Sequence, residues 1–180
     1  MSGSYIERLG IGFAVGGGID DFAGDTMRSQ TSLGGSWTAR VTFGTKSYIA
    51  LEGSYIGSAQ SIETLGLDND AVLVGNGAQG ALRINVLKDF YAQPFVFGGI
   101  AWRHYSIENN SINTSDVSNT DDVAEFPVGV GVSGYIGGFM ADVRGEYRFA
   151  TAEDLAPSRN NSGEATLDRW GVTGNLGFSY

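Results

Sequence analysis

The chain has 180 residues, 28 glycines, no cysteine, a single histidine (His104) and a formal net charge of −9. The absence of cysteine excludes disulfides and thiolate sites, the lone histidine excludes histidine clusters, and the negative charge argues against nucleic acid as a partner. Abundant glycine and aromatic residues with few helix formers predict an all-β chain, which we expect to form a single domain over residues 1–180.

Apolar residues recur at every second position through the first part of the chain, which is the period of a β-strand. This alternation predicts strands near 7–18, 34–45, 49–55, 72–86 and 91–107. In each strand the apolar set stands opposite glycine, small polar or charged residues. Long polar segments near 19–33, 58–71 and 108–124 follow the first, third and fifth strands, whereas short turns follow the second and fourth.

The segment from Phe126 to Phe149 gives the clearest pattern. Two alternating stretches flank Gly137 and Gly138, as in a β-hairpin with a tight glycine turn. A helix is excluded because each interior glycine would cost roughly 1 kcal/mol and the period is two. A fourth long polar segment, 151–166, precedes a last strand in which Trp170, Val172 and Leu176 share the apolar face.

Two folds could carry this alternation: a water-exposed antiparallel sheet with a salt-bridged surface, or a barrel in a membrane. Charges of opposite sign alternate over Asp142, Arg144, Glu146 and Arg148, roughly 7 Å apart on the face that also carries glycine. This face suits a narrow enclosed interior, and the Val, Ile and Phe face suits lipid. No run of 18 apolar residues is present, so a membrane-spanning helix is excluded. Eight strands with long loops at one end and short turns at the other predict an all-β, eight-stranded antiparallel up-and-down transmembrane β-barrel.

The chain resembles the small outer-membrane barrels of the OmpA and OmpX type over essentially its full length. The segment from Gly174 to Tyr180, with Leu176, Phe178 and Tyr180 at alternate positions, is similar to the terminal signal read by the barrel-assembly machinery, although the family usually ends in Phe. The resemblance implies a monomer in the outer membrane of a Gram-negative bacterium, in contact with outer-membrane lipid and lipopolysaccharide. Because residues 1–4 lack the features of a secretory signal, we expect export with the signal removed.

Most arginines fall at positions that face the interior in this interpretation. The expected charge network of the lumen comprises Arg8, Arg40, Glu52, Arg83, Arg103, Asp142, Arg144, Glu146, Arg148 and Arg169, with Glu7, Glu125 and Asp168 as further candidates at the rims. Buried charges require partners, so these groups should pair and fill the lumen. The alternative is a narrow, porin-like channel for ions or small solutes.

The long loops are acidic. Their only basic residues are Arg28 and Arg159, against the carboxylates Asp20, Asp21, Asp25, Glu63, Asp68, Asp70, Glu108, Asp116, Asp121, Asp122, Glu153, Asp154 and Glu164. They could simply be solvated, bridge to lipid phosphates through divalent cations, or bind a basic cell-surface partner. Asp68-Asn69-Asp70 lacks the remaining ligands of a calcium loop, and the sequence predicts no metal or cofactor site.

Two further motifs suggest chemistry. Residues 75–80 match the glycine pattern of dinucleotide-binding loops, but no helix follows to receive a phosphate, so we expect the glycines to make room inside the barrel. His104 and Ser106 on one strand resemble the lipid A deacylase barrels, which use a His, Ser and Glu triad; here Ile107 replaces the expected Asn, and no outward Glu is evident.

The most consistent prediction is a structural membrane anchor or adhesin-like surface protein without catalytic residues. A solute channel and a lipid A-modifying enzyme are the alternatives. We also expect aromatic girdles at the two interfaces, formed by Trp37, Tyr55, Trp102, Tyr147, Phe149 and Trp170 near the loops and by Phe43, Phe139, Phe178 and Tyr180 near the turns.

Overall fold

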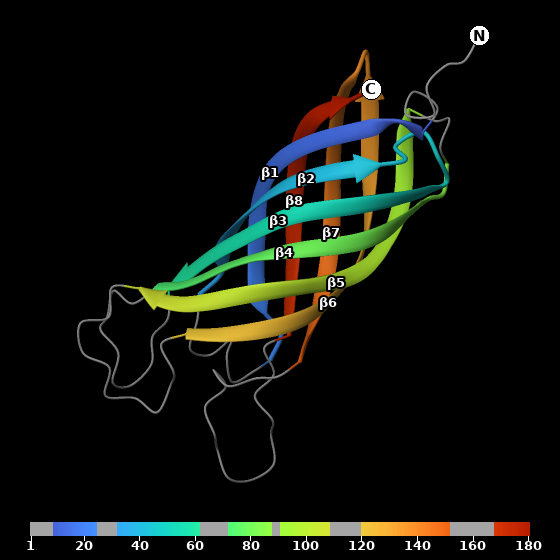
Figure 1. Ribbon diagram of the computed structural model, residues 1–180. Helices are drawn as coiled ribbons and strands as arrows, with labels where there is room; N and C mark the ends of the chain where they lie inside the picture. Colours follow the sequence, from blue (N-terminus) through green and yellow to red (C-terminus); the bar gives the residue numbers. More distant parts are fainter. Residues whose placement is uncertain (1–8, 25–31, 62–71, 88–90, 109–119, 152–167) are drawn as a thin grey trace, which may run out of the picture.

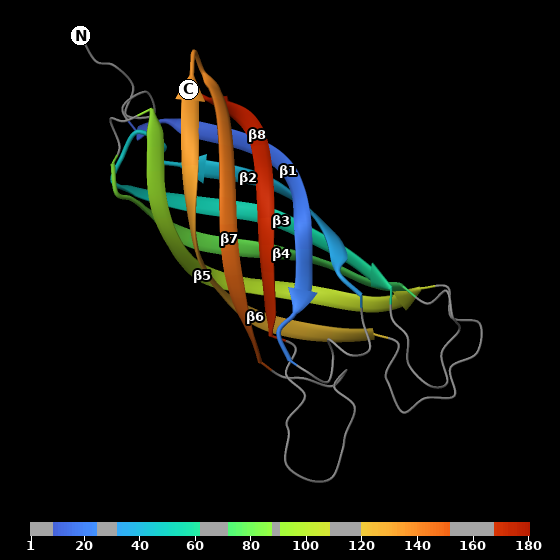
Figure 2. The same cartoon turned by 180° about the vertical axis from the view of Figure 1, so that it is seen from behind.

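A computed structural model describes residues 9–24, 32–61, 72–87, 91–108, 120–151 and 168–180. Eight strands form one closed barrel, each hydrogen-bonded to its neighbour in the sequence and β8 to β1 (Figures 1 and 2). The strands are β1 (Ile11–Phe22), β2 (Gly34–Phe43), β3 (Ile49–Ser61), β4 (Val72–Asn85), β5 (Ala92–Glu108), β6 (Thr120–Ile136), β7 (Phe139–Thr151) and β8 (Arg169–Ser179). All pairs are antiparallel, which confirms the predicted up-and-down barrel. Within these residues, no helix is long and apolar enough to cross a membrane.

The barrel closes where the first and last strands meet. β1 pairs with β8 from Gly12 opposite Ser179 to Phe22 opposite Arg169. At the end of this seam Ile11 N donates to Tyr180 O at 3.1 Å, and Tyr180 N donates to Ile11 O at 2.9 Å. Closure leaves no unpaired strand edge, as a β-structure in lipid requires.

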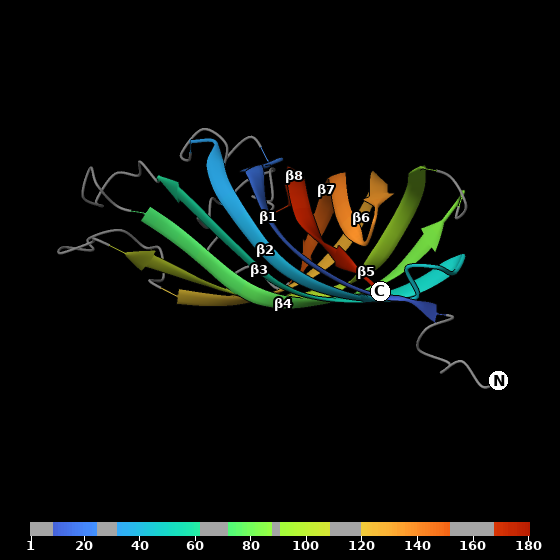
Figure 3. The same cartoon turned by 90° about the horizontal axis from the view of Figure 1, so that it is seen from above.

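The strand register sets the tilt of the strands. A path across the strands from Ile11 passes through Phe43, Leu51, Leu82, Gly98, Val128, Tyr147 and Trp170. It returns to β1 at Asp21, ten residues beyond its start. With about 3.3 Å per residue and about 4.8 Å between strands, this stagger corresponds to a tilt of about 40° from the barrel axis. In a view from above, β2 to β4 and β6 to β7 curve around opposite sides of the interior (Figure 3).

The two ends of the barrel differ. At one end, where the C-terminus lies, tight connections join β2 to β3 and β6 to β7; we call this the turn end. Gly137 and Gly138 have φ values of 56° and 87°, the left-handed conformation of a two-residue type I′ hairpin turn, as the glycine pair predicted. The arrowheads of β3 and β5 in Figure 1 point to the opposite end, which we call the loop end.

Several strands extend further toward the loop end than the polarity of the sequence indicated. β1 continues to Phe22, β3 continues to Ser61, and β6 already begins at Thr120. The predicted placement of Asp20, Asp21, Glu108, Asp121 and Asp122 in loops was therefore wrong. Inside a barrel, polar residues occupy every second strand position, so a polar residue does not mark the end of a strand.

The outer surface is apolar and the interior is charged. Val130, Val143 and Leu176 are 61%, 60% and 69% exposed, whereas Arg83 and Arg144 are 1% and 2% exposed. The predicted orientation of the two faces is thereby confirmed. Phe95 and Phe97 on β5 point inward and are buried, as the alternation indicated despite their apolar character.

Candidate functional site: the charged lumen

The structure places nine of the ten predicted lumen residues inside the barrel, while Arg8 and the rim candidate Glu7 lie outside the described residues. They separate into two groups along the axis. The turn-side layer contains Arg40, Glu52, Arg83, Asp142 and Arg144. The loop-side layer contains Asp20, Arg103, Glu125, Glu146, Arg148 and Arg169.

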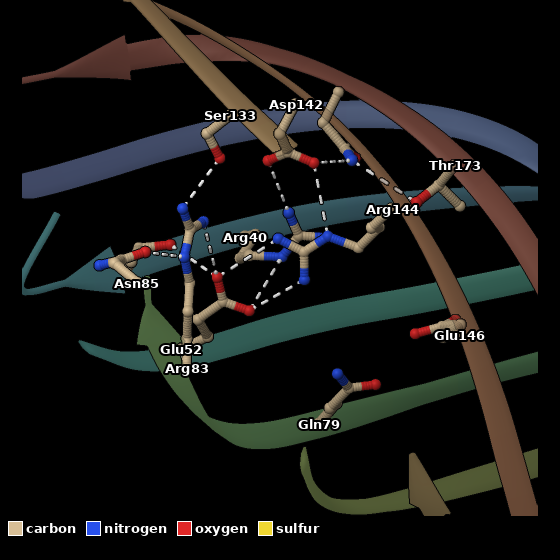
Figure 4. A network of polar contacts seen from close by, with 12 residues as sticks. Arg40, Glu52, Gln79, Arg83, Asn85, Ser133, Asp142, Arg144, Glu146 and Thr173 are labelled. Carbon is tan, nitrogen blue, oxygen red and sulfur yellow. Dashed lines mark hydrogen bonds and ion pairs between the residues drawn. The ribbon is translucent and has the colours of Figure 1, made fainter. Parts of the chain in front are cut away.

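Glu52 is the centre of the turn-side layer. Arg144 donates to it with NH1 at 2.9 Å and NH2 at 3.3 Å, Arg83 approaches at 3.5 Å, and Arg40 approaches at 3.7 Å (Figure 4). Asp142 is shared by Arg40 at 3.3 Å and Arg144 at 3.4 Å. The three guanidinium groups thus come from β2, β4 and β7, and they contact carboxylates on β3 and β7. These ion pairs link strands on opposite sides of the barrel.

Neutral groups complete the hydrogen bonding of this layer. Arg83 donates to Asn85 Oδ1 at 2.6 Å and to Ser133 Oγ at 2.9 Å, and Asn175 donates to Asp142 at 2.7 Å. The guanidinium carbon of Arg83 also lies 3.7 Å from the ring centroid of Phe95. The ring of Phe95 therefore packs against a guanidinium group, so this apolar side chain fits into the charged interior.

Glu125 has the corresponding role in the loop-side layer. It accepts a hydrogen bond from Tyr105 Oη at 2.8 Å, pairs with Arg148 at 3.1 Å and lies 3.6 Å from Arg103. Arg148 also donates twice to Glu146, with Nε at 2.9 Å and NH2 at 2.8 Å. The loop-side layer is stabilised in the same way as the turn-side layer, because Asp20 and Glu125 each contact more than one cationic or hydroxyl donor.

Arg169 closes the loop-side layer on the β1 side. Its NH2 donates to Asp20 Oδ2 at 2.6 Å and to Gln60 Oε1 at 2.7 Å. Its guanidinium lies 4.3 Å from the ring centroid of Phe22. Phe22 packs in turn with buried Leu73, Tyr105 and Val123. An apolar cluster thus lies beside the outermost charges, where it limits their contact with water.

Sequence reasoning missed three members of this site: Asp20, Gln60 and Tyr105. All three share the inward parity of residues that were assigned correctly: Asp20 continues the series Gly12 to Gly18, and Tyr105 follows Arg103 by two. Parity was thus the available signal. Of the rim candidates, Glu125 lies fully inside, while Asp168 is part-exposed and accepts from Tyr147 Oη at 3.1 Å, outside the lumen network.

The His104 motif lies on the outer face near the loop end. His104 Nδ1 lies 2.9 Å from a carboxylate oxygen of Asp122, its direct neighbour on β6, and its ring stacks on Trp102. Ser106 follows two residues later on the same face, about 7 Å along the strand. The structure therefore supplies an acidic partner for His104 that the sequence did not indicate, because Asp122 was assigned to a loop.

The glycine motif at 75–80 lies within β4, with no helix after it. A side chain at Gly75 would meet the Tyr105 ring, and one at Gly77 would meet the Trp102 carbonyl. Gly75 therefore makes room inside the barrel for the Tyr105 ring, as expected, and Gly77 allows the close approach of β5. Residues 68–70 lie outside the described part of the chain, and no cluster of potential metal ligands occurs within it.

A closed eight-stranded antiparallel up-and-down barrel is the fold of the small outer-membrane barrels. Three of the solved structures that match the chain illustrate this likeness over nearly its whole length. They are the N-terminal barrel domain of Pseudomonas aeruginosa OprF (TM-score 0.62, 12% identity, 96% of this chain and 98% of that one), Neisserial surface protein A (0.61, 10%, 95% and 96%) and Ail of Yersinia pestis (0.62, 10%, 96% and 99%). No family model matches the chain, and no curated protein matches its sequence. The likeness therefore lies in the fold.

Proposed function

We propose that the protein is a monomeric integral outer-membrane barrel that serves as a structural anchor or adhesin-like surface protein. In this role the barrel is a rigid support, and the parts of the four long segments that lie between the described strands, 25–31, 62–71, 109–119 and 152–167, are presented at the cell surface. The observation that carries the proposal is the combination of a lipid-compatible exterior with a lumen occupied by its own side chains.

The exterior fits a bilayer in height as well as in polarity. Trp170 and Tyr180 lie ten residues apart on β8, which at the tilt above corresponds to about 25 Å along the axis. This is the usual height of the apolar band of an outer-membrane barrel, flanked by aromatic girdles. Asp168 lies two residues before Trp170 and therefore beyond this band at the loop end, where lipid headgroups would contact it.

The lumen supports an anchor better than a channel. Two layers of paired charges and the Phe22 cluster occupy the axis, and eight strands leave an interior only wide enough for side chains. We expect negligible conductance in planar bilayers, because ion passage would require several buried ion pairs to separate. Large, stable unitary steps would contradict this proposal and favour the channel alternative.

The membrane assignment has an independent test. The protein should require detergent for solubility after refolding, and the folded form should migrate differently from the heated form in electrophoresis. A single mobility with and without heating, together with solubility in buffer alone, would contradict a membrane location. The same result would also contradict the proposed partners, which are the barrel-assembly machinery, lipopolysaccharide and outer-membrane lipid.

The adhesive role depends on the loops and is tested separately. Each of the four segments is replaced by a short glycine-serine linker in a barrel that still shows heat-modifiable mobility. We expect at least one replacement to reduce binding of expressing bacteria to host cells or matrix while the amount at the surface is unchanged. Unaltered binding in all four would leave a purely structural role.

A lipid A-modifying enzyme is the second candidate, and the 2.9 Å contact between His104 and Asp122 favours it. Asp122 would orient the imidazole, His104 would act as base, and Ser106 would be the nucleophile at the outer interface. The test is the mass of lipid A after incubation with the refolded protein. Loss of an acyl chain that Ser106→Ala abolishes would establish the enzyme, and an unchanged mass would exclude it.

A further inference from the structure

The described inward-facing side chains include six arginines but only five carboxylates. The distances between these groups locate the imbalance. Arg103, Arg148 and Arg169 share Asp20, Glu125 and Glu146, three charges against three. In the turn-side layer three arginines share only Glu52 and Asp142. One buried positive charge in this layer therefore has no carboxylate of its own.

A cavity lies between the two layers and borders this excess charge. The volume of the cavity that is open to the centre of a water-sized sphere is about 20 Å³. Its walls include Arg40, Arg144, Thr38, Ser54 and Gln79. This volume is room for one or two particles of that size. The cavity therefore admits a water molecule or a monatomic ion, but not a phosphate or a sulfate.

Donors without partners line the cavity on its turn side. The hydroxyl groups of Thr38 and Ser54 have no hydrogen-bond partner among the described residues, and both side chains are more than nine-tenths buried. Arg40 Nε is likewise unpartnered apart from its long 3.7 Å contact with Glu52. Such groups are costly when unsatisfied, and all three are hydrogen-bond donors of residues that line the same cavity.

We propose that this cavity binds one small monovalent anion, chloride in ordinary buffers. A water molecule would satisfy the donors but not the unbalanced charge, whereas chloride satisfies both and is only slightly larger. The carboxylates on the cavity wall, Asp20 and Glu146, are each held within 2.8 Å by an arginine of the loop-side layer, which reduces their repulsion of an anion. The site is independent of the adhesive role, because it concerns the packing of the barrel.

The direct test uses bromide. The barrel is refolded in sodium bromide, crystallised, and examined by anomalous scattering at the bromine edge. The expected result is one peak within hydrogen-bond distance of Thr38, Ser54 and Arg40. An empty or water-filled cavity at high bromide concentration would overturn the proposal.

The solution test compares chloride with gluconate, which is too large to enter, at equal ionic strength. The urea midpoint in lipid vesicles should rise saturably with chloride only, and the double variant Thr38→Val with Ser54→Ala should lose that rise. Ser58→Ala should keep the chloride-dependent rise. This variant removes a buried lumen hydroxyl that accepts a hydrogen bond from Arg103, and Ser58 does not line the cavity. Arg40→Gln, which balances the lumen charges, should also abolish the chloride dependence. Equal midpoints in the two salts for the unmodified protein would refute anion binding.

Discussion

At the level of single residues, Glu52 is the most consequential side chain of the lumen. Its side chain is fully buried and contacts three arginines. Glu52→Gln would leave three guanidinium groups sharing Asp142 alone, and breaking a buried ion pair typically costs about 3–5 kcal/mol. We therefore expect a loss of that order in the free energy of unfolding, measured by urea titration in lipid vesicles.

Glu146→Gln is the matched control for this substitution. Its side chain is partly accessible (13%), and its partner Arg148 keeps Glu125 at 3.1 Å. The substitution should therefore cost clearly less than Glu52→Gln. If both variants unfold at the same urea concentration, the distinction between a central and a peripheral carboxylate is wrong.

At the level of the strand, two glycines of β4 test which face of the sheet points out of the barrel. A methyl group at Gly80 would point into open space outside the barrel, whereas one at Gly77 would lie against the carbonyl oxygen of Trp102 on β5. Gly80→Ala should therefore fold like the unmodified protein. Gly77→Ala should sharply reduce the fraction with the mobility of the folded form in unheated electrophoresis, because β4 and β5 cannot separate within a closed ladder. Equal folding of the two variants would contradict the register of this strand pair.

The last strand carries a second prediction. Phe178 and Tyr180 are exposed on the outer face, and Phe178 packs against Phe139 in a tilted arrangement with ring centroids 4.8 Å apart. If these residues form the assembly signal, Tyr180→Phe should assemble normally in cells, whereas Phe178→Ala with Tyr180→Ala should accumulate unfolded in the periplasm. Refolding of purified protein into detergent separates a lost signal from lost stability, because only a stability defect would persist there.

The strands themselves could be predicted from the sequence because lipid imposes a strict period of two. The same rule placed Arg83, Arg144 and Glu52 inside without any structural information. It failed at the loop ends, where Asp20 and Asp122 were assigned to loops because a charged residue ordinarily terminates an apolar pattern. In a charged lumen that inference does not hold.

The pairing inside the lumen could not be predicted in this way. Asp20 meets Arg169, which is 149 positions away, and Glu52 meets Arg144, which is 92 positions away. These contacts depend on the ten-residue stagger of the barrel, which brings residues of distant strands to the same height. Alternation along a strand gives the face of a residue but not its height relative to the other strands.

At the level of the whole molecule, charge is divided between the lumen and the loop end. Six of the nine arginines are buried among the described lumen residues, and the two lysines, Lys46 and Lys88, belong by sequence to the short turns. The four long segments carry Arg28 and Arg159 against many carboxylates, even when Asp20 and Asp21, buried in β1, are set aside. The surface that would face the exterior is therefore strongly anionic.

This distribution of charge predicts which partners the loop end can bind. Ail has been crystallised with the heparin analogue sucrose octasulfate, a polyanion, and its fold matches this barrel with a TM-score of 0.57 in that complex. The present chain should not bind such a polyanion at its loop end, because like charges repel across an exposed surface. In lipid nanodiscs at physiological salt we expect no retention on immobilised heparin, but retention on immobilised polylysine that falls as salt increases. Replacement of segment 109–119, which lies between β5 and β6, by a neutral one of equal length should weaken the polylysine interaction. Specific binding to heparin would show that the net charge of the loops does not determine the partner.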